Sequence, residues 1–181
     1  PNMVTVAGTV ATVSIALICI PQGWIWQGGI ALAVVMFGDS VDGTLARMTT
    51  GGTRFGAFLD STLDRLGDGA VFGSLTAYAV FQMENSFVRT WAIIAGICSI
   101  VGAAAVPYAR ARAESVGVVA KLGIAERTDR LIIGMGTAIL MSLGLPEWVF
   151  AAGLTWVAFA SFVTVCQRIW FTARHIDEGA S

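Results

Sequence analysis

The chain is short, apolar and nearly neutral: it has 181 residues, of which 56% are hydrophobic and 13% charged, and a net charge of -1. Its mean hydropathy is +0.75. A soluble domain of this length carries far more charge, so the composition excludes one. The small net charge gives no indication of nucleic-acid binding. We therefore predict an integral membrane protein that has the lipid bilayer as a partner.

Six apolar stretches follow one another along the chain, each close to the ~20 residues that cross a hydrocarbon core. They cover roughly residues 3–20, 24–46, 56–81, 88–109, 128–145 and 147–170. The breaks between them are short and contain turn-forming residues such as Pro21, Gly51 and Pro146, which leaves no room for a separate soluble domain. These features predict an all-α integral membrane protein, with six transmembrane helices in one bundle that forms a single domain over residues 1–181.

Basic residues are distributed unevenly between the two ends of the predicted bundle. Most of them gather at the second break, at the fourth break and at the end of the sixth stretch, whereas Arg89 lies at the opposite end. Trp24, Trp26, Trp91 and Trp148 also lie near that opposite end, as expected for an interfacial aromatic belt. By the positive-inside rule, both termini face the cytoplasm. We therefore expect a multi-pass protein of the cell membrane.

The most informative stretch covers residues 39–64 and has the pattern D-x2-D-G-x2-A-R-x8-G-x3-D-x3-D. Its members are Asp39, Asp42, Gly43, Ala46 and Arg47 in the second apolar stretch, and Gly56, Asp60 and Asp64 in the third. On two helices, these spacings place each set along one face. Two carboxylates from each helix therefore converge. We expect them to line a polar cavity that is shielded from lipid and open to the cytoplasm.

Four carboxylates in apolar surroundings require positive charge nearby, because an unpaired carboxylate close to hydrocarbon is strongly unfavourable. Hard oxygen ligands suit Mg²⁺, Mn²⁺ or Ca²⁺, and no neighbouring His or Cys in the sequence suggests zinc. The small residues Gly43 and Ala46 allow a ligand to approach the helix closely. Arg47 offers a guanidinium fork for phosphate oxygens. The pattern predicts a site for metal ions and phosphates.

Two other interpretations of the same acids stay open. The aspartates could form a helix-packing network with Arg47 and Arg65, or they could line the ion path of a transporter. A divalent-cation transporter would account for carboxylates inside a membrane. It would not account for the small residues beside them or for Arg47.

The pattern over residues 39–64 resembles the signature of the CDP-alcohol phosphatidyltransferases at all eight of its fixed positions. The resemblance implies an enzyme that transfers the phosphatidyl group of CDP-diacylglycerol to the hydroxyl of an alcohol and releases CMP. Its cofactor would be Mg²⁺, with Mn²⁺ as an alternative, and Asp64 would take the proton of the acceptor hydroxyl. The implied ligands of two ions are Asp39, Asp42, Asp60 and Asp64. The residues implied to contact CDP-diacylglycerol are Gly43, Ala46, Arg47 and Gly56.

A second polar region connects the fourth and fifth stretches and is rich in arginine, including Arg110, Arg112 and Arg130. One interpretation is an ordinary basic loop that sets the membrane topology. The other is an anion pocket, because several guanidinium forks at a water-exposed rim suit a phosphate monoester. Within this region Arg110 and Glu114 are four residues apart and can share a helix face.

Over nearly its whole length, the sequence also resembles the actinobacterial branch of that family that makes phosphatidylinositol phosphate. The matching elements are residues 55–65, 111–114, 124–130 and 167–168. This resemblance implies a soluble phosphorylated alcohol, inositol phosphate, as the acceptor, and phosphatidylinositol phosphate and CMP as the products. The acceptor phosphate would bind Arg110, Arg130 and Arg168. Arg110 stands where the branch usually has Lys, which keeps the charge but changes the reach.

The resemblance also concerns the start of the chain and its assembly. The amphipathic helix that precedes the first membrane helix of the family is expected to be absent here. Asn2 and Thr5 would approach the nucleotide, and a simple helix cap is the alternative for them. A homodimer is implied. Gly69 and Gly73 form a small-residue pair that fits either a subunit interface or packing inside one bundle.

Two further alternatives stay open. A phosphatidylglycerophosphate synthase, which uses glycerol 3-phosphate, would share the eight pattern residues and would also need a basic acceptor pocket. Asp68 extends the acidic row of the third stretch by one turn but lies outside the family signature. It could orient arginines, bind acceptor hydroxyls or form a buried pair with a neighbouring helix.

Overall fold

A computed structural model of the chain describes residues 2–50 and 53–176, without the side chains of residues 2, 37 and 39–50. The described residues form six α-helices, which confirms the predicted all-α fold. In chain order the helices are α1 (Asn2–Cys19), α2 (Ile25–Thr50), α3 (Arg54–Phe81), α4 (Phe87–Ser115), α5 (Arg127–Ser142) and α6 (Glu147–His175).

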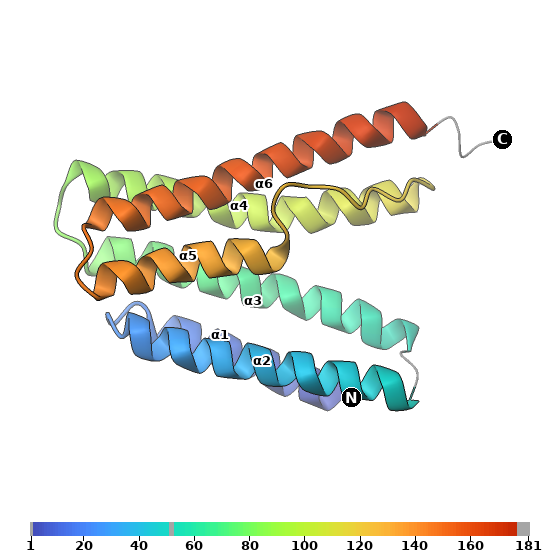
Figure 1. Cartoon of the computed structure of the whole chain (residues 1–181), viewed down its shortest axis with the longest axis horizontal. Helices are drawn as coiled ribbons and strands as arrows, with labels where there is room; N and C mark the ends of the chain where they lie inside the picture. The colour runs from blue at the N-terminus through green and yellow to red at the C-terminus, as the bar shows by residue number, and fades with distance from the viewer. Residues whose placement is uncertain (1, 51–52, 177–181) are drawn as a thin grey trace.

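The six helices form an elongated bundle in which successive helices run in opposite directions (Figure 1). The helices α1 and α2 pair on one side, and on the other α6 packs against both α4 and α5. Between them lies α3, which contacts both α1 and α4. The starts of α1, α3 and α5 therefore point toward the same end of the bundle as the ends of α2, α4 and α6.

The core receives buried side chains from all six helices, and its largest fully buried side chains include Phe72, Leu75 and Phe150. The most extensive helix contact is that of α4 with α6. Small residues line this contact, and the Ser99 hydroxyl donates to the Leu154 carbonyl across it at 2.9 Å. Small side chains let two helix backbones approach closely, which is how helices associate in an apolar medium.

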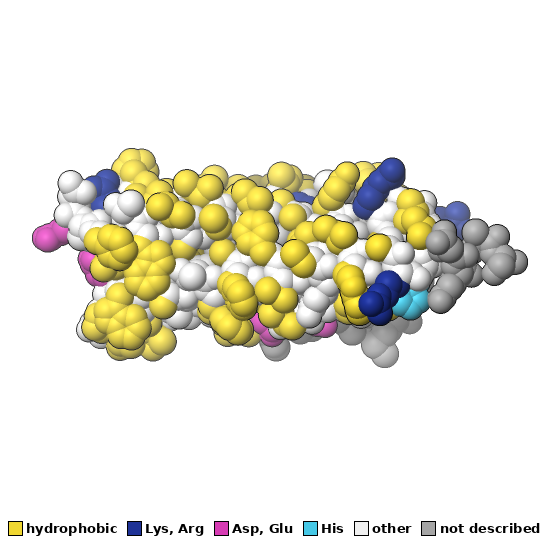
Figure 2. All heavy atoms as spheres, turned by 90° about the horizontal axis from the view of Figure 1, so that it is seen from above, with side chains coloured by type: hydrophobic (Ala, Val, Ile, Leu, Met, Phe, Trp, Pro, Cys, Tyr) yellow, Lys and Arg dark blue, Asp and Glu magenta, His cyan; other side chains and the backbone are white. Residues whose placement is uncertain are grey.

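The outer surface is rich in hydrophobic side chains, which dominate the middle of the face shown in Figure 2. In the part of the chain that the structure describes, two helices of 29 residues each, α4 and α6, are long and apolar enough to cross a membrane. Shorter apolar helices cover Met3–Cys19 and Ile25–Met36. These features fit a membrane protein.

The helices differ in length more than the six similar stretches predicted from the sequence. With 16 residues, α5 is only about 24 Å long. In contrast, α4 continues through Pro107 to Ser115, so that the predicted arginine-rich loop begins on a helix. Alanines around the arginines favour this extension, because alanine is the strongest helix former.

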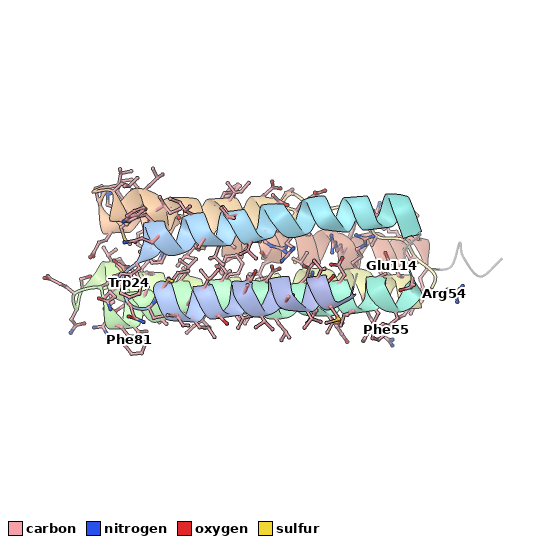
Figure 3. All side chains as sticks on the ribbon, turned by 90° about the horizontal axis from the view of Figure 1, so that it is seen from below. Trp24, Arg54, Phe55, Phe81 and Glu114 are labelled. Carbon is pink, nitrogen blue, oxygen red and sulfur yellow. The ribbon has the colours of Figure 1, made fainter. Side chains whose placement is uncertain are left out.

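The two ends of the bundle differ in their side chains. Trp24 and Phe81 lie at one end, and Arg54, Phe55 and Glu114 lie at the other (Figure 3). The basic groups near the break after α2 and at the end of α4 thus share one end, as the sequence predicts.

The glycine pair in α3 does not pack inside the bundle. A Cβ atom added at Gly69 or Gly73 would meet no described atom within 4 Å. Close contacts occur instead at Gly102, where an added Cβ would lie 2.6 Å from Ser161 Cβ of α6. Of the two roles considered for Gly69 and Gly73, tight packing within one chain therefore has no support among the described residues.

The close contact at Gly102 predicts that Gly102→Ala destabilises the protein. Ser161 has to shift to admit the new methyl group, and such overpacking costs about 1–3 kcal/mol. The measurement is the thermal unfolding midpoint of the purified protein in detergent. Gly136→Ala in α5 is the matched control, because its Cβ would meet no described atom within 4 Å; an equal midpoint for both variants would contradict the prediction.

Candidate active site

An acidic row runs along one face of α3. Thr53 caps the start of this helix, and its hydroxyl oxygen accepts the Gly56 N–H at 3.0 Å. Asp60, Asp64 and Asp68 follow at intervals of four residues. Asp64 is repelled by both of its acidic neighbours. The row passes from half-buried carboxylates to Asp68, which is almost completely buried.

Arg127, the first residue of α5, joins two carboxylates of this row. Its Nη1 lies 2.9 Å from Asp64 Oδ1, and its Nε donates to Asp68 Oδ1 at 2.7 Å. The start of α5 is itself held by a cap, in which the Glu126 N–H donates to Asp129 Oδ2 at 3.0 Å. The guanidinium of Arg127 thus ties α5 to α3 at the acidic row.

Arg130 lies one turn further along α5 and is only 3% exposed. Its Nη2 is 4.0 Å from Asp68 Oδ2, which is too long for a hydrogen bond. Its Nε and Nη1 are buried and have no hydrogen-bond partner among the described residues. Buried polar groups are normally satisfied, so these two donors are open to a partner that the described residues do not supply.

A small polar cavity of about 60 Å³ adjoins Asp64 and Arg127. It lies between α1, α2, α3 and α5. The residues that line it are Gly8, Thr9, Thr12, Met36, Leu63, Asp64, Gly67 and Arg127. The proposed base therefore borders a pocket that four helices build, rather than the outer apolar surface.

Of the other two predicted acceptor residues, Arg168 lies near Arg130 and Arg110 lies near Arg168, and both have protein partners. Arg168 is close enough for its charge to repel those of Arg110 and Arg130. Arg110 Nε pairs with Glu114 Oε1 at 2.9 Å, as their spacing predicts. Arg168 donates from Nε to the Leu122 carbonyl at 2.9 Å and from Nη1 to the Val106 carbonyl at 2.5 Å. Part of the hydrogen-bonding capacity of Arg168 thus holds the chain between α4 and α5.

The α2 half of the predicted site lies outside the described side chains. This applies to Asp39, Asp42, Gly43, Ala46 and Arg47, although the helix that carries them is described as far as Thr50. The side chain of Asn2 lies outside the described part as well. The backbone carbonyl of Thr5 accepts the Thr9 hydroxyl at 2.9 Å.

Among the side chains that the structure describes, no three acidic, histidine or cysteine groups converge closely enough to hold a metal ion. Asp60 and Asp64 supply two hard carboxylate donors one helical turn apart. The ligand types fit Mg²⁺ or Mn²⁺. The other two expected ligands, Asp39 and Asp42, lie outside the described side chains.

Sequence reasoning missed the role of Arg127. It treated this residue as part of a basic region and left the partner of Asp68 open. The structure shows that the buried Asp68 pairs with the half-buried Arg127 of a neighbouring helix. One sequence signal was available. Arg127 and Arg130 are three residues apart, so on a helix they share one face, just as acids four residues apart do.

The sequence matches the family described as CDP-alcohol phosphatidyltransferase over residues 1–165. It is 41% identical to the phosphatidylinositol phosphate synthase of Mycolicibacterium smegmatis, over 93% of this chain and 75% of that protein. It is 39% identical to the synthase of the same name from Cutibacterium acnes, over 93% of this chain and 83% of that protein.

Solved structures with the same fold include a phosphatidylinositol phosphate synthase of Mycobacterium tuberculosis. Its crystal structure with CDP-DAG bound superposes with a TM-score of 0.86 at 36% identity, covering 95% of this chain and 85% of that one. Its complex with manganese and citrate gives the same TM-score and identity, covering 96% and 82%. At this level of similarity the two chains share both fold and family.

The bonds of Arg168 predict how Arg168→Lys behaves. Lysine keeps the charge but has no planar fork to hold two carbonyls at once. We expect residues 118–126 to exchange amide hydrogens faster in this variant, as measured by mass spectrometry in detergent. Arg174→Lys is the control, because Arg174 lies over the Trp170 ring near the end of α6. Equal exchange in both variants would contradict the prediction.

Proposed function

The chain belongs to the CDP-alcohol phosphatidyltransferase family, and from that premise we propose that it transfers the phosphatidyl group of CDP-diacylglycerol to inositol phosphate. The products are phosphatidylinositol phosphate and CMP. The observation that carries this proposal is the similarity to phosphatidylinositol phosphate synthases over more than nine-tenths of the chain. The arginines near the acidic row support the acceptor, because they suit a phosphate monoester.

The proposal includes an arrangement in the cell membrane. Six helices cross the bilayer, and the end that carries the acidic row and the arginine-rich segment faces the cytoplasm. The uneven distribution of Lys and Arg supports this orientation. A soluble nucleotide and a phosphorylated alcohol are both found on that side of the membrane. The shortness of α5 is compatible with this arrangement, because Arg130 near its start is buried within the bundle.

The cofactor in this proposal is a pair of Mg²⁺ ions, with Mn²⁺ as an alternative. Their ligands are Asp39, Asp42, Asp60 and Asp64. Support comes from the carboxylate chemistry of α3, where Asp60 and Asp64 repel each other and gain from a shared cation. When bound, the ions neutralise the diphosphate of CDP-diacylglycerol and favour departure of CMP.

The protein groups then have separate tasks. The diphosphate gains access to the helices at the small residues Gly43, Ala46 and Gly56. It is contacted by Arg47. The nucleotide is approached by Asn2 and Thr5. The residues that bind the acceptor phosphate are Arg110, Arg130 and Arg168. Binding at the phosphate places the acceptor hydroxyl in line with the lipid-side phosphorus.

Asp64 takes the proton of that hydroxyl in the proposed reaction. Its Oδ1 is held by Arg127 at 2.9 Å, and its Oδ2 lies 3.7 Å from Arg65 Nη2. Because the Oδ2 contact is the longer of the two, Oδ2 is the atom assigned to the proton. The Arg127 contact keeps the carboxylate in one orientation.

A homodimer completes the proposal. The Gly69 and Gly73 face of α3 supports it, because this face of small residues is open in the single chain.

An acceptor panel tests the function. The enzyme in detergent is given CDP-diacylglycerol and Mg²⁺ with inositol phosphate, glycerol 3-phosphate or free inositol, and CMP release is measured with radiolabelled substrate. We expect the highest kcat/KM with inositol phosphate, because its phosphate engages the arginines and its ring supplies the hydroxyl. A preference for glycerol 3-phosphate would identify a phosphatidylglycerophosphate synthase. Divalent-cation uptake into vesicles without nucleotide would instead indicate a transporter.

The Asp64→Asn variant tests the assignment of the base. Asparagine keeps the shape of the side chain but cannot accept the proton, so CMP release should fall by at least about 100-fold. CDP-diacylglycerol should still bind, as measured by protection against thermal unfolding. Glu84→Gln is the control, because Glu84 lies in the exposed turn between α3 and α4, at the opposite end of the bundle. This variant should keep full activity. An active Asp64→Asn variant would remove Asp64 from the role of base.

A further inference from the structure

Asp68 is the most deeply buried acid of the α3 row, with 3% of its side chain exposed, and it lies outside the eight-residue pattern. Its Oδ1 accepts the bond from Arg127 at 2.7 Å. Its Oδ2 makes no hydrogen bond to the described residues and faces Arg130 Nη2 at 4.0 Å. A carboxylate at this depth is strongly unfavourable without charged partners. Asp68 is therefore the common counter-ion of two arginines.

Arg130 is held by this charge but remains short of hydrogen bonds. Asp68 attracts it, while other positive groups repel it, namely Arg65, Arg127 and Arg168. The contact with Asp68 leaves Arg130 Nε and Nη1 without partners among the described residues. These donors remain free for an anion with several oxygens, such as phosphate. Asp68 thus stabilises the position of Arg130 and leaves Nε and Nη1 unused.

The contacts form one alternating series of charges between α3 and α5. Asp64 contacts Arg127, Arg127 contacts Asp68, and Asp68 faces Arg130. The acids are four residues apart on α3 and the arginines three apart on α5, so that both pairs lie on facing sides of their helices. The proposed base and a proposed phosphate ligand are therefore connected through Asp68.

We propose that Asp68 is a positioning residue for the acceptor: it holds Arg130 ready for the acceptor phosphate and, through Arg127, fixes Asp64 relative to that phosphate. This inference rests on the proposed function, because it takes Arg130 to bind the phosphate and Asp64 to meet the hydroxyl. Asp68 does not touch the acceptor. It determines how the hydroxyl lies against the base once the phosphate is bound, which is the geometry on which the rate depends.

The test compares Asp68→Asn with the unaltered enzyme in steady-state kinetics with Mg²⁺. Without the charge at position 68, Arg130 loses the group that attracts it and moves. We expect the KM for inositol phosphate to rise about tenfold, as for loss of one charged contact. The KM for CDP-diacylglycerol should stay within about twofold, because its proposed ligands lie elsewhere.

Ser99→Ala is the matched control for a purely structural effect. It removes a buried hydrogen bond between α4 and α6, so we expect a lower unfolding temperature. Both KM values should be unchanged. If Asp68 only joined α3 to α5, its Asn variant would behave like this control. A variant with lower stability but an unchanged acceptor KM, or with both KM values raised equally, would overturn the proposal.

A second measurement needs neither catalysis nor a divalent ion. Inorganic phosphate should raise the unfolding temperature of the unaltered protein, and Asp68→Asn should need about tenfold more phosphate for the same effect. If the unaltered enzyme transfers to no phosphorylated alcohol, the proposed function fails, and this measurement still tests the role of Asp68. Equal phosphate dependence of the two proteins would overturn that role.

Asp68→Glu provides the comparison if the Asn variant does not fold. Glutamate keeps the charge but moves it by one methylene, so that the contact with Arg130 changes while a buried anion remains. We expect an acceptor KM a few-fold above that of the unaltered enzyme. A fully active Glu variant with an unchanged acceptor KM and an unchanged phosphate dependence would overturn the proposal.

Discussion

The ion pairs of Arg127 with Asp64 and Asp68 are the contact on which the rest of the site depends. The helices α3 and α5 touch each other far less than α4 and α6 do, and these charged contacts join them at the start of α5. Buried ion pairs contribute little net stability, because desolvation opposes their attraction. Removing one partner is nevertheless costly, since the other charge is left alone. Of the three groups, Asp68 is the buried one, so loss of Arg127 would leave its charge without the partner that hydrogen-bonds to it.

Around this contact the bundle divides its tasks between packing and polar chemistry. Small residues on α4 and α6 allow close approach, and the Ser99 bond to Leu154 fixes their register. The polar cavity lies on the other side, between α1, α2, α3 and α5. The tightly packed helices α4 and α6 thus lie on one side of the bundle, and the charged side chains lie beside the pocket on the other side. This division suits an enzyme of the CDP-alcohol phosphatidyltransferase family, whose substrates combine apolar chains with charged groups.

The arginines of the site differ in how fully the protein satisfies them. Arg168 donates hydrogen bonds to the carbonyls of Leu122 and Val106 and so holds the segment between α4 and α5. Arg130, at greater depth, has free donors among the described residues. Because buried donors are normally satisfied, this contrast supports the proposal that Arg130 binds the acceptor phosphate. Arg110 forms an ion pair with Glu114 at the exposed rim.

The sequence by itself determined what depends on short spacing and composition. It predicted six helices, the pairing of Arg110 with Glu114, and the family, since a helix brings residues four apart together and the pattern over residues 39–64 is contiguous in the chain. The tertiary structure alone decided which helices face each other. The partner of Asp68 is Arg127, 59 positions away, and the close packing occurs at Gly102 rather than in the Gly69 pair. Such contacts depend on how whole helices pack, and no local spacing encodes that packing.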